Sequence, residues 1–246
     1  MRAEDFQAQA RMLPIQTLAA ALGDTPILVL CPHPDDESLG CGGLILEACA
    51  QGIPLTVVFL SDGTGSHPSS AQYPKPVLRE LREAEALAAC KILGVAEDSI
   101  HFLRYPDRHV PSNGAQAEAA ALKISDIMCQ TGAAAIFVTW TGDPHCDHKA
   151  ASAIAKEACR LRDGTRLFEF PVWGWILPVD APCPDVEPRG FRLSVEKHLA
   201  KKRSAIFQHK SQTTSLIADD PHGFRLEPEM IDMLLQPYEV YLEATP

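Results

Sequence analysis

In ILVLCPHPDDE, residues 27–37, an apolar segment is followed directly by a turn rich in acidic residues, and this pattern indicates the fold class. Residues 27–30 are all apolar, which is typical of a strand buried on both faces of a parallel sheet. The sequence predicts further strands at residues 55–60, 100–103, 135–139 and 167–176.

Helical segments alternate with these strands, and a glycine follows each helix, as is common at helix C-termini. The helices are expected at residues 39–50, 77–93, 115–130 and 147–162, followed by Gly52, Gly94, Gly132 and Gly164. This alternation predicts a Rossmann-like α/β fold, with three layers (α/β/α) around a mostly parallel sheet. We predict a single domain over residues 1–246, with a core at about 26–213 and the segment 214–246 packed on it.

Charge and composition exclude several classes of partner. The chain of 246 residues has 32 acidic and 22 basic side chains, a net charge of −10, which argues against nucleic acid and anionic membranes. No apolar run is long enough to span a membrane, and no export signal is expected at the N-terminus. The eight cysteines form no CxxC pair, so we expect reduced thiols in a cytoplasmic protein. A homo-oligomer is compatible with all of these features.

The first candidate site follows the strand at residues 27–30 and contains His33, Asp35, Asp36 and Glu37. Ligands bind at the carboxyl ends of the strands in open α/β sheets. Three carboxylates and an imidazole so close together repel one another unless a cation neutralises them, and zinc accepts both ligand types. The alternative interpretation is a plain turn in which Asp36 caps the next helix.

The second candidate site, Asp143 to His148, follows the strand at residues 135–139. We expect Asp143 to cap a helix, which would put His145 and His148 on one face and let Asp147 orient an imidazole. Two solvated histidines at a helix start are the alternative. One histidine and one carboxylate from the first site, with one histidine from the second, would form a three-ligand catalytic zinc site with an open position.

The HPDDE stretch at residues 33–37, the GCGG stretch at 40–43 and the HCDH stretch at 145–148 resemble the PIG-L/LmbE-type zinc-dependent N-deacetylases. An R-x-x-E pattern at Arg82 and an HKSQ stretch at residues 209–212 agree with this family. The resemblance covers about residues 27–213. At Asp143, some members that act on sugar thiols carry a tyrosine, so their substrate is not carried over.

The resemblance implies a set of roles for individual residues. It implies metal ligands at His33, Asp36 and His148, a general base at Asp35, an oxyanion stabiliser or acid at His145, and substrate contacts from Arg82 and His209. We also expect Asp147 and Glu37 to support the site by hydrogen bonding, and Asp62 to line the pocket rim. The implied cofactor is Zn²⁺, with Fe²⁺ or another divalent cation as the alternative. The implied reaction is hydrolysis of an N-acyl amide, above all N-acetyl, on an amino sugar or a related small molecule.

Other readings stay open at this point. Arg82 and Glu85 are spaced to pair along one helix, and Asp107 and Arg108 follow the third strand at the same rim, where loop polarity explains them equally well. The loops 61–76 and 178–190 are expected to shape the pocket.

Three other functions share features with this sequence. A dinucleotide site is excluded because Ile45 replaces the third glycine and the acidic turn repels a pyrophosphate; Gly42 and Gly43 are instead expected to let the helix pack on the sheet. A zinc amidase for a non-sugar amide, such as a thiol conjugate, uses the same chemistry. A protein that only binds a metal or sugar would not need Asp35 beside Asp36.

Overall fold

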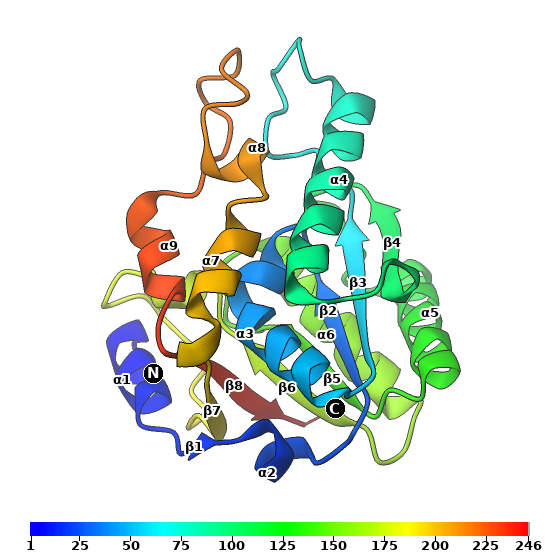
Figure 1. Ribbon diagram of the computed structural model, residues 1–246, viewed down its shortest axis with the longest axis vertical. Helices are drawn as coiled ribbons and strands as arrows, with labels where there is room; N and C mark the ends of the chain where they lie inside the picture. Colours follow the sequence, from blue (N-terminus) through cyan, green and yellow to red (C-terminus); the bar gives the residue numbers. More distant parts are fainter. Residues whose placement is uncertain (246) are drawn as a thin grey trace.

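One eight-stranded sheet organises the chain in the computed structural model, which describes residues 1–245 (Figure 1). The strands are β1 (Ile15–Gln16), β2 (Ile27–Cys31), β3 (Leu55–Ser61), β4 (Ile100–Tyr105), β5 (Ala135–Thr139), β6 (Arg166–Phe170), β7 (Gly190–Ser194) and β8 (Tyr238–Ala244). Their order is β1-β7-β8-β6-β5-β2-β3-β4. All neighbouring pairs are parallel except the two that involve β8.

Helices cover both faces of this sheet. They are α1 (Ala3–Arg11), α2 (Leu18–Leu22), α3 (Asp36–Gln51), α4 (Lys75–Leu93), α5 (Gly114–Thr131), α6 (Cys146–Arg160), α7 (Leu199–Ile206), α8 (Lys210–Thr213) and α9 (Pro228–Leu234), with 3₁₀ turns η1 (Glu97–Ser99), η2 (Trp173–Trp175) and η3 (Glu196–His198). Helices α3, α4 and α7 lie on one face and α5 and α6 on the other (Figure 1). The predicted three-layer α/β/α fold is confirmed.

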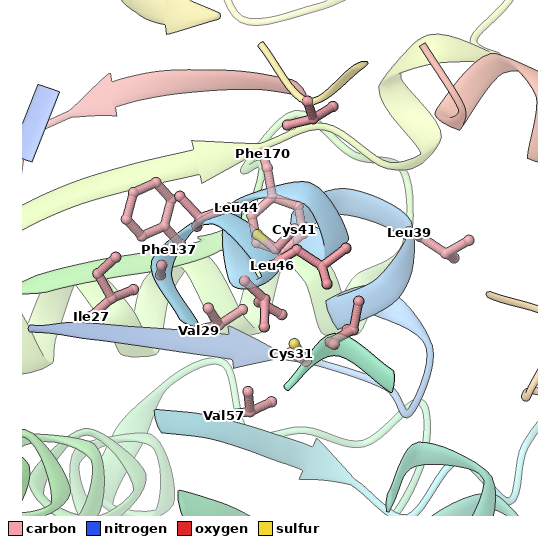
Figure 2. Packing of buried hydrophobic residues seen from close by; sticks show 14 of the residues in the cluster. Ile27, Val29, Cys31, Leu39, Cys41, Leu44, Leu46, Val57, Phe137 and Phe170 are labelled. Atoms are coloured by element: carbon pink, nitrogen blue, oxygen red, sulfur yellow. The ribbon is translucent and has the colours of Figure 1, made fainter. Parts of the chain in front are cut away.

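The central strand β2 is buried on both faces, which explains its uninterrupted apolar run. Ile27, Val29 and Cys31 contribute to the core beneath α3, where Figure 2 shows them beside side chains of that helix. Leu28 and Leu30 point the other way, into the core shared with α5 and α6. Removing this apolar surface from water is the main force that holds the layers together.

The structure differs from the sequence prediction at several boundaries. Helix α6 ends at Arg160, and Gly164 lies beyond its end, so this glycine is no helix cap. The strand predicted for residues 167–176 ends at Phe170, because Pro171 has no N–H to donate and the chain then turns into η2. Strand β8 comes from the segment predicted only to pack on the core, and it lies inside the sheet between β6 and β7.

The glycines of α3 allow close approach to the sheet, and the prediction holds for Gly43 but not for Gly42. A Cβ on Gly43 would lie 2.4 Å from Val195, just after β7, and 3.0 Å from Glu239 on β8. Gly40 also lets α3 pack on the sheet, since a Cβ there would lie 2.1 Å from the ring of Phe170 on β6. Gly42 instead faces Lys202 of α7.

No helix within residues 1–245 combines the length and apolar character needed to cross a membrane. The eight cysteines are all free thiols in the described part of the chain, as the sequence predicts.

Candidate active site

The two predicted site segments meet because β2 and β5 are neighbours in the sheet. The strands run parallel, with Leu30 opposite Val138, so the turns that follow them emerge at the same edge. Helix α3 leaves this edge on one face and α6 leaves it on the other, which makes a crevice of the kind that binds ligands in open α/β sheets. The rings of His33 and His148 lie 5.4 Å apart, centre to centre, although 115 positions separate them in the chain.

The carboxylate of Asp36 lies between these two imidazoles. Its Oδ2 is 3.4 Å from Nδ1 of His33, and its Oδ1 is 3.5 Å from Nε2 of His148. Metal–ligand bonds of about 2.0–2.1 Å in a tetrahedral zinc site separate neighbouring ligand atoms by roughly 3.3 Å. Each distance from Asp36 is close to this value, and ligand nitrogens of His33, His145 and His148 lie within 4.8 Å of one another, a spacing that could hold a metal ion.

Outer carboxylates hold each imidazole by its other nitrogen. Nε2 of His33 lies 3.2 Å from Asp147 and 3.3 Å from Asp107, and Nδ1 of His148 lies 2.8 Å from Asp143. Because carboxylates accept these N–H groups, the remaining lone pairs of both rings face Asp36. Nε2 of His148 is a buried atom with no hydrogen-bond partner among the described residues. Such carboxylate–histidine pairs are the usual support of a metal ligand.

The electrostatics of this corner favour ionised carboxylates. Burial raises the pKa of Asp36, but His148 and His33 outweigh burial and bring it down to about 2. Burial likewise lowers the pKa of His33, yet the hydrogen bonds that its ring donates to Asp107, Asp147 and Asp36 raise it well above its usual value. The carboxylates around His33 and His148 thus stabilise a positive charge at these two imidazoles, either as a proton or as a metal ion.

Asp35 has an unusual backbone and a shifted pKa. Its φ of 147° is a conformation that residues with a side chain rarely adopt. The backbone N–H of Asp35 donates to Glu37, and Nη2 of Arg82 donates to its Oδ2 over 2.9 Å. Burial raises the pKa of Asp35 to about 6 although Arg82 opposes the rise. A carboxylate with that pKa suits a general base near neutral pH.

Arg82 does not pair with Glu85. Its guanidinium donates to Asp35 and to the carbonyl oxygens of Pro34 and Gly63, while Glu85 accepts from Ser211. The Arg82 side chain is only 3% exposed. It borders the cavity, but its two terminal nitrogens already bind the protein, so the predicted contact with substrate stays a prediction.

His145, not Asp143, caps helix α6. The helix begins at Cys146, and Nδ1 of His145 accepts the backbone N–H of Asp147 over 3.1 Å. The predicted cap at Asp143 is wrong because that carboxylate is held by His148 and by backbone N–H groups of residues 172–174. With Nδ1 accepting, the ring proton of neutral His145 sits on Nε2. Burial and the nearby His33 and His148 lower the pKa of His145 to about 4.

Two predicted substrate contacts lie outside the cavity. Oδ1 of Asp62 accepts the backbone N–H groups of Thr64 and Asp107 and so ties two rim loops together. His209 is buried behind the site, and its Nε2 lies 2.8 Å from Glu37, which in turn accepts the N–H of Asp35. Neither Asp62 nor His209 borders the cavity.

The sequence does not identify Asp107 and Asp143 as the carboxylates that hold the two histidines. Its position after a strand predicts that Asp107 lies at the rim, but the contact of Asp107 with His33 depends on the fold of a separate turn. The sequence predicts a helix cap at Asp143, because no local pattern links residues 172–174 to it. The available signal in both cases is an acidic residue just beyond a strand, at the edge of the sheet where ligands bind.

A cavity of about 410 Å³ opens above these residues. His33, Asp35, Asp36, His145 and His148 lie on its polar side, and Leu39, Trp173, Phe224 and Leu226 line an apolar side. The loop at residues 61–76 contributes Gly65 and Ser66, as expected. The loop at 178–190 does not border the cavity; it contacts the N-terminus instead, where Ala3 donates to Ala181 and Cys183 to Met1.

Known proteins resemble this chain in sequence and in fold. The family model described as PIG-L, GlcNAc-PI de-N-acetylase, matches residues 28–159. The uncharacterized deacetylase YaiS of Escherichia coli K12 is 25% identical over 203 residues, which span 82% of this chain and 99% of that protein.

Two solved structures share the fold at 18% identity. An N,N'-diacetylchitobiose deacetylase from Pyrococcus horikoshii covers 98% of this chain and 87% of its own, with a TM-score of 0.68. A 4-carboxy-2-hydroxymuconate hydratase from Pseudomonas putida KT2440 covers 90% and 97%, with a TM-score of 0.65. Since one is a hydrolase and the other a hydratase, the fold alone does not set the reaction.

Proposed function

Since the chain belongs to the PIG-L family of de-N-acetylases, we propose that it is a metal-dependent hydrolase of N-acylated amino sugars or related small molecules. The products would be a carboxylate and a free amine. The observation that carries the proposal is the position of Asp36 between the free lone pairs of His33 and His148, beside a base candidate at Asp35.

We assign the metal to His33, Asp36 and His148. Two imidazole nitrogens and a carboxylate oxygen suit Zn²⁺, and Fe²⁺ accepts the same donors. When bound, such an ion supplies a Lewis acid that polarises the scissile carbonyl and lowers the pKa of a water toward neutrality. Asp147, Asp107 and Asp143 keep the two imidazoles oriented for this task.

Asp35 takes the proton in the first step. As water attacks the carbonyl carbon, a carbon–oxygen bond forms and one water proton passes to the Asp35 carboxylate. Arg82 holds that carboxylate by its Oδ2 and keeps a positive charge beside it. Nε2–H of neutral His145 donates to the carbonyl oxygen as it becomes negative.

The carbon–nitrogen bond then breaks, and the leaving nitrogen needs a proton. We assign its delivery to Asp35, which has just gained one. His145 is a weaker candidate, because its lowered pKa of about 4 keeps the ring neutral and its Nδ1 stays bound to the helix N-terminus. Water thus supplies one oxygen of the carboxylate and one proton of the amine, and its second proton is released when the carboxylic acid ionises.

Release of primary amine tests the proposal. N-acetylglucosamine, diacetylchitobiose and a set of N-acylated non-sugar amines would be incubated with the protein, with and without a chelator. We expect amine release that the chelator abolishes and that added Zn²⁺ or Fe²⁺ restores. Tight metal binding without amine from any substrate would favour the non-catalytic metal-binding alternative.

We propose a sugar because the matching family model is described as a GlcNAc-PI de-N-acetylase. The cavity of about 410 Å³ is large enough for a small molecule of this kind. If non-sugar amides alone are cleaved, the protein is the amidase of the alternative reading. We also propose that the protein is cytoplasmic, as the cysteine pattern predicts.

A further inference from the structure

The apolar side of the cavity consists of Leu39, Trp173, Phe224 and Leu226, which come from three separate segments of the chain. We propose that this side, here called the apolar wall, binds the acyl group of the substrate and selects acyl chains longer than acetyl. The inference rests on the proposed hydrolysis of an N-acyl amide and names the class of acyl group that it removes.

The apolar wall begins beside the proposed metal ligands. Leu39 is three residues beyond Asp36 in α3, and its N–H donates to the carbonyl of Asp35. On the other side, the N–H of Trp173 donates over 3.3 Å to Asp143, the carboxylate that holds His148. A scissile carbonyl at the metal would therefore lie next to both ends of the wall.

Ser66 and Arg108, here called the polar rim, also line the cavity, with hydroxyl and guanidinium groups that suit the hydroxyls of a sugar. The two substituents of the amide point in opposite directions from the scissile bond. We therefore direct the amine portion toward this polar rim and the acyl portion toward the apolar wall.

The apolar wall is held in place before any substrate binds. The N–H of Phe224 donates to Ser66 over 2.7 Å, and the N–H of Leu226 donates to Gln212 over 2.7 Å. The rings of Trp173 and Phe224 meet edge to face, with centres 5.5 Å apart. Both rings are only partly buried, so each leaves apolar surface in the cavity.

The size of this surface favours a longer chain. The methyl group of an acetyl would cover only a small part of the Trp173 and Phe224 rings, which supply most of this surface because Leu39 and Leu226 are only 2% and 3% exposed. Each added methylene that displaces water from the wall contributes about 0.8 kcal/mol, which corresponds to roughly a fourfold gain in binding. A chain that covers the wall thus gains affinity that acetyl lacks.

An acyl series on the unmodified protein tests the inference. N-acetyl, N-butanoyl, N-hexanoyl and N-octanoyl glucosamine would be compared by amine release. We expect kcat/KM to rise about threefold to fourfold for each methylene until the apolar wall is covered. A preference for acetyl, with rates falling along the series, would overturn the inference while leaving the proposed hydrolase intact. Release from no member would overturn both.

A truncated wall gives the second arm. Phe224→Ala should flatten the dependence of kcat/KM on acyl chain length, because one of the two rings that face the cavity is removed. Leu216→Ala is the matched control, because Leu216 lies earlier in the same segment, is 41% exposed and does not border the cavity. If Phe224→Ala weakens all acyl lengths by the same factor, the wall holds the sugar and not the acyl chain, and the inference is wrong.

Discussion

Oδ2 of Asp143 accepts a hydrogen bond from Nδ1 of His148 over 2.8 Å, and both side chains are fully buried. The same carboxylate also accepts backbone N–H groups from Val172, Trp173 and Gly174. Asp143 therefore sets the orientation and tautomer of a proposed metal ligand and attaches it to the segment that carries part of the apolar wall.

Replacing Asp143 with asparagine should weaken metal binding. An amide that turns its NH₂ toward His148 would favour the wrong tautomer, and loss of such a supporting carboxylate lowers metal affinity by about 10- to 100-fold. Competition with a chromogenic chelator measures the change. Asp126→Asn on the exposed surface of α5 is the control and should bind metal normally. Unchanged affinity in Asp143→Asn would remove this role from Asp143.

Asp35→Asn should separate catalysis from metal binding. We expect kcat to fall about 10²- to 10⁴-fold because the base is gone, with the metal content retained. Asp36→Asn, the neighbouring substitution of the same kind, should lose the metal itself. Elemental analysis together with amine release distinguishes the two. Near-normal turnover in Asp35→Asn would show that another group takes the proton.

The acid side of the pH profile should report Asp35. A general base works only when ionised, so kcat/KM is present above its pKa and lost as the pH falls through it. Burial raises the pKa of Asp35 to about 6, and a bound cation would pull it down, so we expect the midpoint at or below about pH 6.

Arg82→Gln should move that midpoint to higher pH, because Arg82 lowers the pKa of Asp35. Arg82→Lys, which keeps the charge, should restore most of the original profile. Arg79→Gln on the same helix is the control and should leave the profile unchanged. A midpoint that stays in place in Arg82→Gln would mean that the acid limb belongs to another group.

His145→Ala should reduce kcat by about 10²- to 10³-fold with metal retained, because one donor to the oxyanion is lost. Since the pKa of His145 is lowered to about 4, the substitution should remove no titration from the profile above pH 5. Loss of a basic limb near pH 7 in this variant would instead assign His145 as the acid.

The buried ion pair between Lys202 and Glu239 should contribute to stability and not to catalysis. Nζ of Lys202 lies 2.7 Å from Glu239, both side chains are at most 3% exposed, and Glu239 also accepts the N–H groups of Gly43 and Leu44 in α3. Lys202→Met would leave a buried carboxylate without its cation, at a cost of about 3 kcal/mol in the free energy of unfolding. Urea denaturation measures it, with exposed Lys201→Met as the control. A loss below about 1 kcal/mol would contradict the argument.

The layers of the fold and the position of the site along the chain could be predicted from local patterns in the sequence. Uninterrupted apolar runs such as residues 27–30 require burial on both faces, and the glycines after α3, α4 and α5 end those helices, so both features are local. The site could be located because ligands in such sheets bind where strands end, which puts His33 and His148 at one edge as soon as β2 and β5 are neighbours.

Only the tertiary structure decided which groups support, cap and line the site. Asp143, predicted to cap a helix, instead binds His148, because residues 172–174 pack against it. Arg82, spaced to pair with Glu85, instead donates to Asp35, because α4 packs against the turn that follows β2. The apolar wall likewise combines Leu39, Trp173 and Phe224 from distant segments. Such contacts depend on the packing of elements far apart in the chain, and no local pattern of residues encodes them.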